Sequence, residues 1–141
     1  MFKLKSEIQF DMAHYLSQYK GKCANIHGHR YKLIATLKAD KLHEEGQTRG
    51  MVEDFGEFKK ALKLIADIFD HKLIIEDNVE GREVASKLKE VNNFEILFLP
   101  FRTTAEEMSR YIYNKLKEMN FPIYEVELFE TPTNRIIYSE E

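Results

Sequence analysis

The sequence has little cysteine, proline or glycine and no tryptophan. Its 141 residues contain one cysteine, Cys23, with three prolines and six glycines. A single cysteine excludes a disulfide within the chain and suits a reducing cytoplasm, where we expect the protein to reside. Nothing marks a linker, because the chain has no Pro/Gly-rich stretch, no internal repeat and no low-complexity tract. We therefore expect one domain with one hydrophobic core over residues 1–141.

Long hydrophobic runs and a large net charge are also missing. The longest apolar run covers residues 96–101, is interrupted by Pro100 and is far too short to span a bilayer. The first ten residues alternate charged with apolar side chains and so do not resemble a signal peptide. A formal net charge of −3 argues against a broad electrostatic contact with nucleic acid. We expect a soluble protein that binds neither a membrane nor nucleic acid.

Near each end, the sequence alternates apolar and polar residues as strands do. This alternation covers residues 2–10 and 31–38, and the short polar connection between these segments favours antiparallel pairing. Two further strands are expected over residues 124–130 and 135–138, with Pro132 in the turn between them.

Helical spacing fills the middle of the chain. Asp54 is suited to cap a helix that ends near residue 70, and a shorter helical pattern covers residues 84–91. Thr103 or Thr104 opens another long helix, because an acidic residue lies three positions after each. Together with the strands, this order predicts an α+β domain with a four-stranded antiparallel sheet and two main helices on one face. Its edge strands would be unpaired within one chain.

Three histidines gather near the turn between the first two strands. His27 and His29 stand two residues apart, so on an extended chain their side chains share a face, and Gly28 between them permits close approach. His14 follows the first strand, where an antiparallel partner would bring the other two alongside. Three such imidazoles suit Zn²⁺ and leave a fourth position for water or substrate. The alternative is that these are ordinary hydrogen-bonded or solvated histidines, as we expect for His43.

Cys23 lies four residues before His27 and allows three interpretations. It is a fourth zinc ligand, a small buried apolar side chain, or a reactive thiol. Free cysteines are most often simply buried. A cationic neighbourhood would instead lower the pKa of the thiol, and a thiolate with a near-neutral pKa is a competent general base.

Two further acidic positions have both a structural and a functional interpretation. Asp70 and His71 close the first long helix, where they serve either as charge complementarity to the helix end or as a proton relay with Cys23. Glu130 ends the third strand, where its carboxylate is either solvated or accepts two parallel N–H bonds from a planar heterocycle.

Taken together, these residues resemble the 6-pyruvoyltetrahydropterin synthase family. The resemblance runs in family order over nearly the whole chain, and its most specific element is the cysteine followed by the His-Gly-His triplet. The segments that carry it are Phe10-Asp11-Met12-Ala13-His14, Cys23-Ala24-Asn25-Ile26-His27-Gly28-His29-Arg30-Tyr31, Gly50-Met51-Val52-Glu53-Asp54-Phe55, Asp70-His71, Thr104-Ala105-Glu106 and Glu130-Thr131.

The resemblance implies a fold, an assembly and roles for single residues. The fold would be the tunnelling fold, assembled as a homo-hexamer (a dimer of trimers) with active sites between subunits. By transfer, His14, His27 and His29 would bind zinc, and Cys23, Asp70 and His71 would transfer protons. Glu130 would anchor the pterin ring, and Thr104 would lie near it, although capping a helix also explains Thr104.

The implied substrate is 7,8-dihydroneopterin triphosphate. The short spacing from Cys23 to His27 favours the branch that makes 6-carboxy-5,6,7,8-tetrahydropterin, a step toward queuosine, with release of acetaldehyde and triphosphate. The alternatives are a 6-pyruvoyltetrahydropterin synthase, which eliminates triphosphate only, and a non-catalytic module that binds pterin or metal. Residues 76–101 form a longer segment than the family pattern leads us to expect, with an additional helical stretch.

Overall fold

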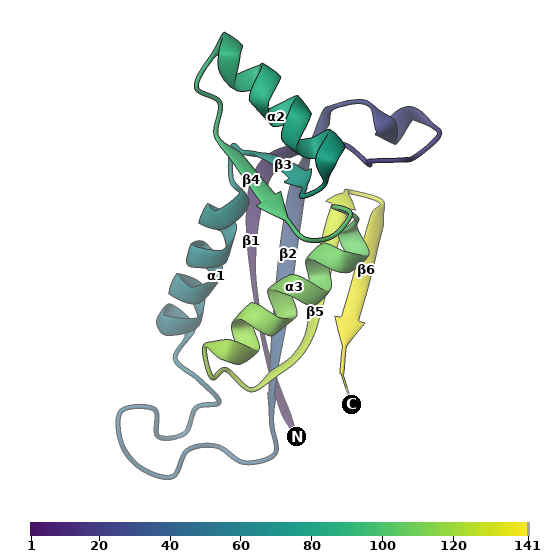
Figure 1. The fold of residues 1–141 in the computed structure, drawn as a ribbon. Helices are drawn as coiled ribbons and strands as arrows, with labels where there is room; N and C mark the ends of the chain where they lie inside the picture. The colour runs from purple at the N-terminus through teal and green to yellow at the C-terminus, as the bar shows by residue number, and fades with distance from the viewer. Residues whose placement is uncertain (141) are drawn as a thin grey trace.

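The computed structural model describes residues 1–140 as a curled sheet with three α-helices (Figure 1). The six strands lie in the order β4-β3-β1-β2-β5-β6. In chain order the elements are β1 (Phe2–His14), the short 3₁₀ turn η1 (Lys22–Ala24), β2 (His27–Ala39), α1 (Phe55–Phe69), β3 (Leu73–Glu76), α2 (Val79–Val91), β4 (Ile96–Leu99), α3 (Ala105–Glu118), β5 (Ile123–Thr131) and β6 (Asn134–Ser139). Within residues 1–140, no helix combines the length and the apolar character needed to cross a membrane.

The centre of the sheet is a long antiparallel pair. β1 and β2 pair along their full length, from Phe2 opposite Ala39 to His14 opposite His27. β5 pairs with β2 and β6 with β5, also antiparallel. Because strand residues alternate between faces, this register sends one set of side chains into the core and leaves the charged set on the opposite face.

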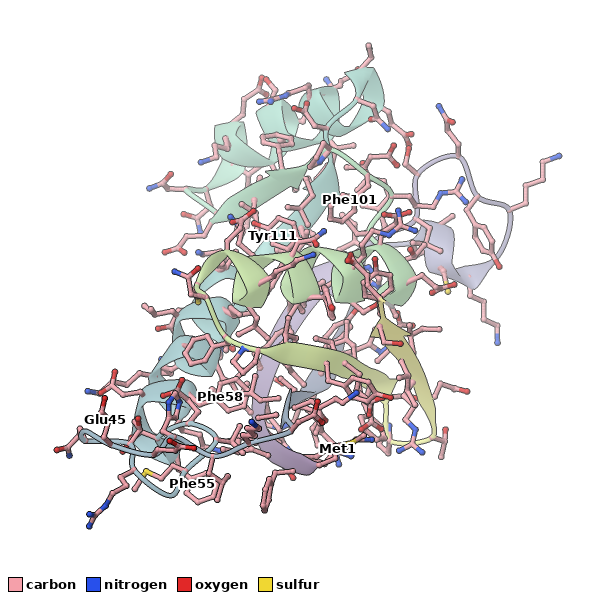
Figure 2. All side chains as sticks on the ribbon, turned by 90° about the horizontal axis from the view of Figure 1, so that it is seen from below. Met1, Glu45, Phe55, Phe58, Phe101 and Tyr111 are labelled. Atoms are coloured by element: carbon pink, nitrogen blue, oxygen red, sulfur yellow. The ribbon has the colours of Figure 1, made fainter. Side chains whose placement is uncertain are left out.

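Helices α1 and α3 cover one face of this antiparallel part of the sheet (Figure 1). The Asp54 carboxylate accepts from the Glu57 backbone N–H and caps α1, and the Thr104 hydroxyl caps α3 in the same way. Figure 2 shows Phe58 turned into the interior, where it is fully buried, whereas Phe55 is 72% exposed on the outside of α1. The expectation of two main helices on one face is confirmed for α1 and α3.

The expectation of a four-stranded antiparallel sheet was wrong in the number of strands and in the direction of two of them. β3 pairs with the end of β1 and β4 pairs with β3, both in parallel, so the sheet is mixed and has six strands. Each added strand has only four residues, three apolar ones before Glu76 in β3 and four apolar ones in β4, a pattern that alternation does not identify. The longer segment 76–101 is therefore largely a parallel crossover, in which α2 connects β3 to β4.

α2 packs on the sheet face opposite to α1 and α3. Ile74 of β3 belongs to the main core, whereas its neighbour Ile75 packs with Tyr15 and Ala85 in a separate small cluster. Because Ala85 is a residue of α2, that helix covers the second face near the β3–β4 edge. This end of the sheet is thus covered on both sides, while the other face of β1, β2 and β5 carries charged residues without a helix over them.

Candidate metal centre

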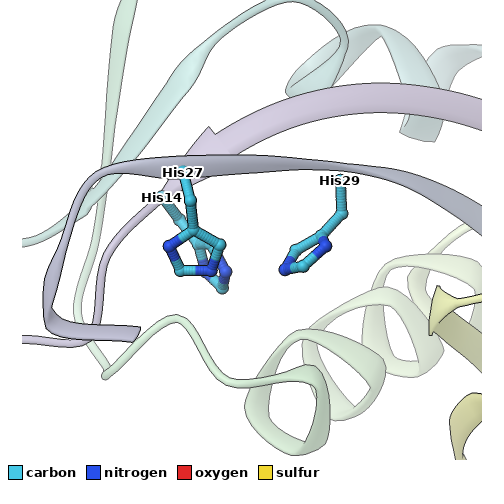
Figure 3. Close-up of side chains that lie close together, drawn as sticks. All are labelled: His14, His27 and His29. Carbon is cyan, nitrogen blue, oxygen red and sulfur yellow. The ribbon is translucent and has the colours of Figure 1, made fainter. Parts of the chain in front are cut away.

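The antiparallel register of β1 and β2 brings three histidines together at one end of the sheet (Figure 3). His14 lies directly opposite His27, and His29 follows on the same face of β2. One ring nitrogen from each of the three lies within 4.8 Å of the others. Sequence reasoning predicted this convergence from the spacing alone.

Backbone carbonyls fix the orientation of two of these rings. Nδ1 of His14 lies 2.8 Å from the carbonyl oxygen of Thr103, and Nδ1 of His27 lies 2.6 Å from that of Asn25. A carbonyl only accepts, so in both rings Nδ1 carries the proton and Nε2 keeps its lone pair. This is the arrangement in which metal-ligating histidines are usually held.

His14 is kept neutral by its surroundings. It is 2% exposed, and this burial lowers its pKa from 6.5 to about 4, against the opposing effect of the hydrogen bond to Thr103. The positive charge that His27 and His29 would carry lowers the same pKa further. The buried Tyr31 hydroxyl donates to Nε2 of His14 at 3.4 Å, so a metal ion would take over the lone pair that this hydroxyl now contacts.

The third ring leaves a polar atom without a partner. Nε2 of His29 is buried and accepts or donates no hydrogen bond within residues 1–140, and the nearest acidic atom, Oε1 of Glu130, is 3.6 Å away. An orphaned ring nitrogen beside two nitrogens with directed lone pairs fits a bound metal ion. The donor set is therefore suited to a metal held by three imidazoles with a free position beside Glu130.

The Asp70–His71 pair lies at the edge of β1. Oδ1 of Asp70 accepts from the Asp11 backbone N–H at 3.0 Å and lies 3.1 Å from Nδ1 of His71. The hydrogen bond from Asp11 lowers the pKa of Asp70, and the contact with His71 lowers it as well. The His71 backbone has φ of +61° and donates to the Asp11 carbonyl, while its ring is 79% exposed. The carboxylate thus orients a histidine that is free to contact another molecule.

Within one chain this pair and the histidine triad belong to different parts of the surface. His71 lines a cleft of about 620 Å³ together with Asp11, Ala13 and Arg30. Asp11, Ala13 and Arg30 alternate with Met12, His14 and His29 and so project from the face opposite to the triad, whereas Met12 and His29 also contribute to the lining of the cleft. Cys23 is half-buried in η1, on the turn between β1 and β2. The turn joins His14 to His27, so Cys23 lies on the chain segment between two residues of the triad.

The Thr104 hydroxyl accepts from the Glu107 backbone N–H at 3.2 Å, so its helix-capping role is present. The partners Thr103, Asn25 and Tyr31 were not predicted as site residues. A backbone carbonyl leaves no trace in a residue type, but Tyr31 had a usable signal, because it continues the alternation of His27 and His29 along β2.

The comparisons with known proteins agree with this geometry. A family profile described as 6-pyruvoyl tetrahydropterin synthase matches residues 3–141. The chain belongs to the 6-pyruvoyl tetrahydropterin synthase family. It is 41% identical to a 6-carboxy-5,6,7,8-tetrahydropterin synthase from Haemophilus influenzae, over 99% of this chain and 100% of that one. It is 33% identical to a protein of the same name from Rickettsia conorii, over 94% and 96% of the two chains.

Solved structures show the same family fold. The structure of the 6-pyruvoyl tetrahydropterin synthase from Caenorhabditis elegans superposes with a TM-score of 0.69 at 24% identity, over 99% of this chain and 96% of that one. An uncharacterized protein from Wolinella succinogenes gives a TM-score of 0.77 at 18% identity, over 99% and 98% of the two chains. At these identities the likeness establishes the fold and no more.

Proposed function

We propose that the chain converts 7,8-dihydroneopterin triphosphate to 6-carboxy-5,6,7,8-tetrahydropterin, with release of acetaldehyde and triphosphate. The observation that carries this proposal is the triad of His14, His27 and His29. Hydrogen bonds at Nδ1 leave the Nε2 lone pairs of His14 and His27 available to a metal, and Nε2 of His29 has no hydrogen-bond partner within residues 1–140. Full-length similarity to relatives named for this product supports the choice of reaction.

Zinc is the metal we assign to the triad. Three neutral imidazoles with one open position are typical of a catalytic zinc site. When bound there, the ion would supply Lewis acidity and orient the hydroxyls of the substrate's side chain. The chain's own contribution is to hold two of the three rings, those of His14 and His27, through the carbonyls of Thr103 and Asn25.

Cys23, Asp70 and His71 are the proposed proton-transfer residues. The Cys23 thiolate would remove a carbon-bound proton from the substrate side chain, and His71 would give or take a proton on the other side. Asp70 would hold the His71 ring through Nδ1 and leave Nε2 for the substrate. A free thiol in this role agrees with a cytoplasmic location, which we also propose.

Glu130 is the proposed anchor for the pterin ring. Its carboxylate lies 3.6 Å from His29, so a ring bound by Glu130 would carry its side chain toward the triad. An ionised carboxylate accepts two parallel N–H bonds, as the pyrimidine edge of a pterin offers. The Thr104 hydroxyl, which accepts in the helix cap, retains its proton for donation to the substrate.

We further propose that the working site lies between subunits of a homo-hexamer, a dimer of trimers. What supports this is that Asp11 and Ala13, which line a cleft with His71, project from the sheet face opposite to the triad. A complete site would then take His71 from one chain and Cys23 from another. Open strand edges supply the means. Within residues 1–140, the part of β1 before Ala13 has no strand on its β3 side, and β6 pairs only with β5.

Product analysis tests the proposed reaction. The zinc-loaded protein, incubated with 7,8-dihydroneopterin triphosphate, should release acetaldehyde and triphosphate in equal amounts, measured by mass spectrometry beside metal analysis of the same sample. A product that keeps its three-carbon side chain would identify a pyruvoyl-forming synthase instead. Release of neither compound would contradict an enzymatic role. Cys23→Ala should abolish turnover and keep its zinc.

Mixing inactive variants tests the shared site. Cys23→Ala and His71→Ala are each expected to be inactive alone. When the two are unfolded, mixed and refolded together, hexamers with both chains contain sites with an intact Cys23 and an intact His71, so part of the activity should return. Mixtures that remain inactive, although native mass spectrometry finds hexamers with both variants, would contradict the assignment of these residues to different chains.

A further inference from the structure

The loop that carries Cys23 is closed at its base by one backbone hydrogen bond. It leaves β1 after His14 and returns to β2 at His27, and the Leu16 N–H donates to the Cys23 carbonyl at 2.8 Å. Its tip is exposed, including Tyr19 and Lys20. Because the tip makes few contacts, the position of the thiol depends on how the base is held.

The base of this loop is attached to the N-terminus of α2 by a small polar network. Ser17 is 2% exposed, and its hydroxyl donates to Oε2 of Glu80 at 3.0 Å. The same hydroxyl accepts from the Asn78 side-chain amide at 2.9 Å. Oδ1 of Asn78 in turn accepts from the Gly81 N–H at 2.7 Å and caps the helix. A buried hydroxyl with both of its roles filled is strongly oriented.

The helix end that makes these contacts is itself fixed to the sheet. A Cβ built on Gly81 would lie 2.2 Å from the carbonyl oxygen of Glu76 and 2.7 Å from a side-chain carbon of Ile75. α2 therefore begins closer to β3 than any residue with a side chain would allow. The network thus connects the Cys23 loop to a rigid anchor in the parallel crossover.

We propose that Ser17, Asn78 and Glu80 are positioning residues for Cys23, and that holding this loop is a function of the β3-α2-β4 crossover. This inference rests on the proposed role of Cys23 as a general base. Loss of the network would let the base of the loop open, which exposes the half-buried thiol and displaces it from the substrate. A displacement of about 1 Å is enough to reduce catalysis about a hundredfold.

Alkylation of the thiol measures the position of the loop without any turnover. Cys23 is the only cysteine, so the rate of iodoacetamide labelling reports on this residue alone. Ser17→Ala removes both hydrogen bonds and should raise the labelling rate of the zinc-loaded protein about twofold to tenfold, the change expected for one lost bond or more. We expect kcat to fall at least about threefold with KM and zinc content unchanged.

Two paired variants separate positioning from general destabilisation. Glu80→Gln keeps an acceptor for Ser17 and should label at the rate of the unmodified protein, whereas Glu80→Ala should label faster. Glu83→Ala removes the same charge from an exposed position on the same helix and should change nothing. Equal labelling rates for Glu80→Ala and Glu83→Ala, or a Ser17→Ala protein that is folded and labels at the original rate, would overturn the proposal.

The outcome is distinguishable from a failure of the proposed function. If Cys23→Ala kept full activity, Cys23 would not be the base, yet the labelling rates would still show whether the network holds the loop. If instead Cys23→Ala were inactive and the labelling rates were all equal, the function would stand and the crossover would lose its assigned role.

Discussion

Nδ1 of His14 and the carbonyl oxygen of Thr103 lie 2.8 Å apart, although 89 residues separate them in the sequence. This contact joins the end of β1 to the segment that leads into α3. It holds the proton of His14 on Nδ1, so Nε2 keeps a lone pair, which the Tyr31 hydroxyl contacts at 3.4 Å and a metal ion would take over. The metal centre is thereby oriented before any ion binds.

Removal of one histidine should empty the metal centre. His27→Ala leaves two imidazoles, and we expect its zinc affinity to fall more than about a hundredfold, since even outer partners of a ligand contribute about 10- to 100-fold. Competition with a chromogenic chelator measures the affinity. His43→Ala is the matched control, because His43 is exposed in the loop after β2. Equal zinc binding by the two variants would contradict the ligand assignment.

The metal-free protein should lose stability on mild acidification through His14. Its pKa is about 4 when folded and 6.5 when unfolded, so between these values the unfolded chain binds more protons. The free energy of unfolding should therefore decrease as the pH falls from 6.5 to 4, by up to about 3 kcal/mol from this group. Urea unfolding at several pH values measures this. His14→Gln should show a shallower dependence, and identical slopes would refute the prediction.

Glu130→Gln should weaken substrate binding. The change is nearly isosteric but replaces one acceptor by an N–H₂ donor facing an N–H of the pterin, which leaves a buried donor unpaired. We expect KM to rise about tenfold or more, with zinc content unchanged. Glu125→Gln on the same strand is the control. Equal KM values for the two variants in steady-state kinetics would contradict the assignment of Glu130 to the substrate site.

Thr104→Ala should have two separable effects. Loss of the cap on α3 should reduce the free energy of unfolding by about 1 kcal/mol, measured by urea unfolding. Thr104→Ser keeps the capping hydroxyl and should restore most of it. If Thr104 also donates to the substrate, KM rises in the alanine variant alone. An unchanged KM in both Thr104→Ala and Thr104→Ser would show that Thr104 caps α3 and does not contact the substrate.

Gly81→Ala should destabilise the fold by about 2–3 kcal/mol, at the upper end of overpacking effects. The reason is the 2.2 Å approach of its Cβ to the Glu76 carbonyl oxygen, a backbone atom that has no rotamer by which to move away. Ser86→Ala, exposed on the same helix, should change stability by less than about 0.5 kcal/mol. Equal midpoints in urea would show that α2 shifts without cost.

The parts of the fold that one sequence period describes were predictable. β1, β2, β5 and β6 each alternate because one face packs on α1 and α3, and the caps at Asp54 and Thr104 mark where those helices begin. β3 and β4 were not predicted, because three or four apolar residues in a row show no alternation. The pattern at residues 84–91 indicated a helix, but the start at Val79 was missed, since Gly81 reads as a helix breaker and is in fact required by close packing.

The candidate site was also predictable from the sequence only in part. Convergence of His14 with His27 follows directly from an antiparallel register, which spacing and turn length specify. The backbone carbonyls that orient the histidine rings could not be predicted from the sequence, because every residue type has a backbone carbonyl. Nor could the placement of Asp70 and His71 at the edge of β1, since it depends on the φ of +61° at His71 and on a backbone N–H of Asp11.

Residues of the candidate site lie close to both ends of the β3-α2-β4 crossover. β3 begins two residues after His71, and β4 ends four residues before Thr103, whose carbonyl oxygen contacts His14. Changes in the length of the crossover at the turn between α2 and β4 leave both ends where they are, whereas an inserted or deleted residue in β3 or β4 would shift one end by about 3.3 Å. Natural and engineered variation in this segment should therefore be tolerated around residues 92–95 and rejected within the two short strands.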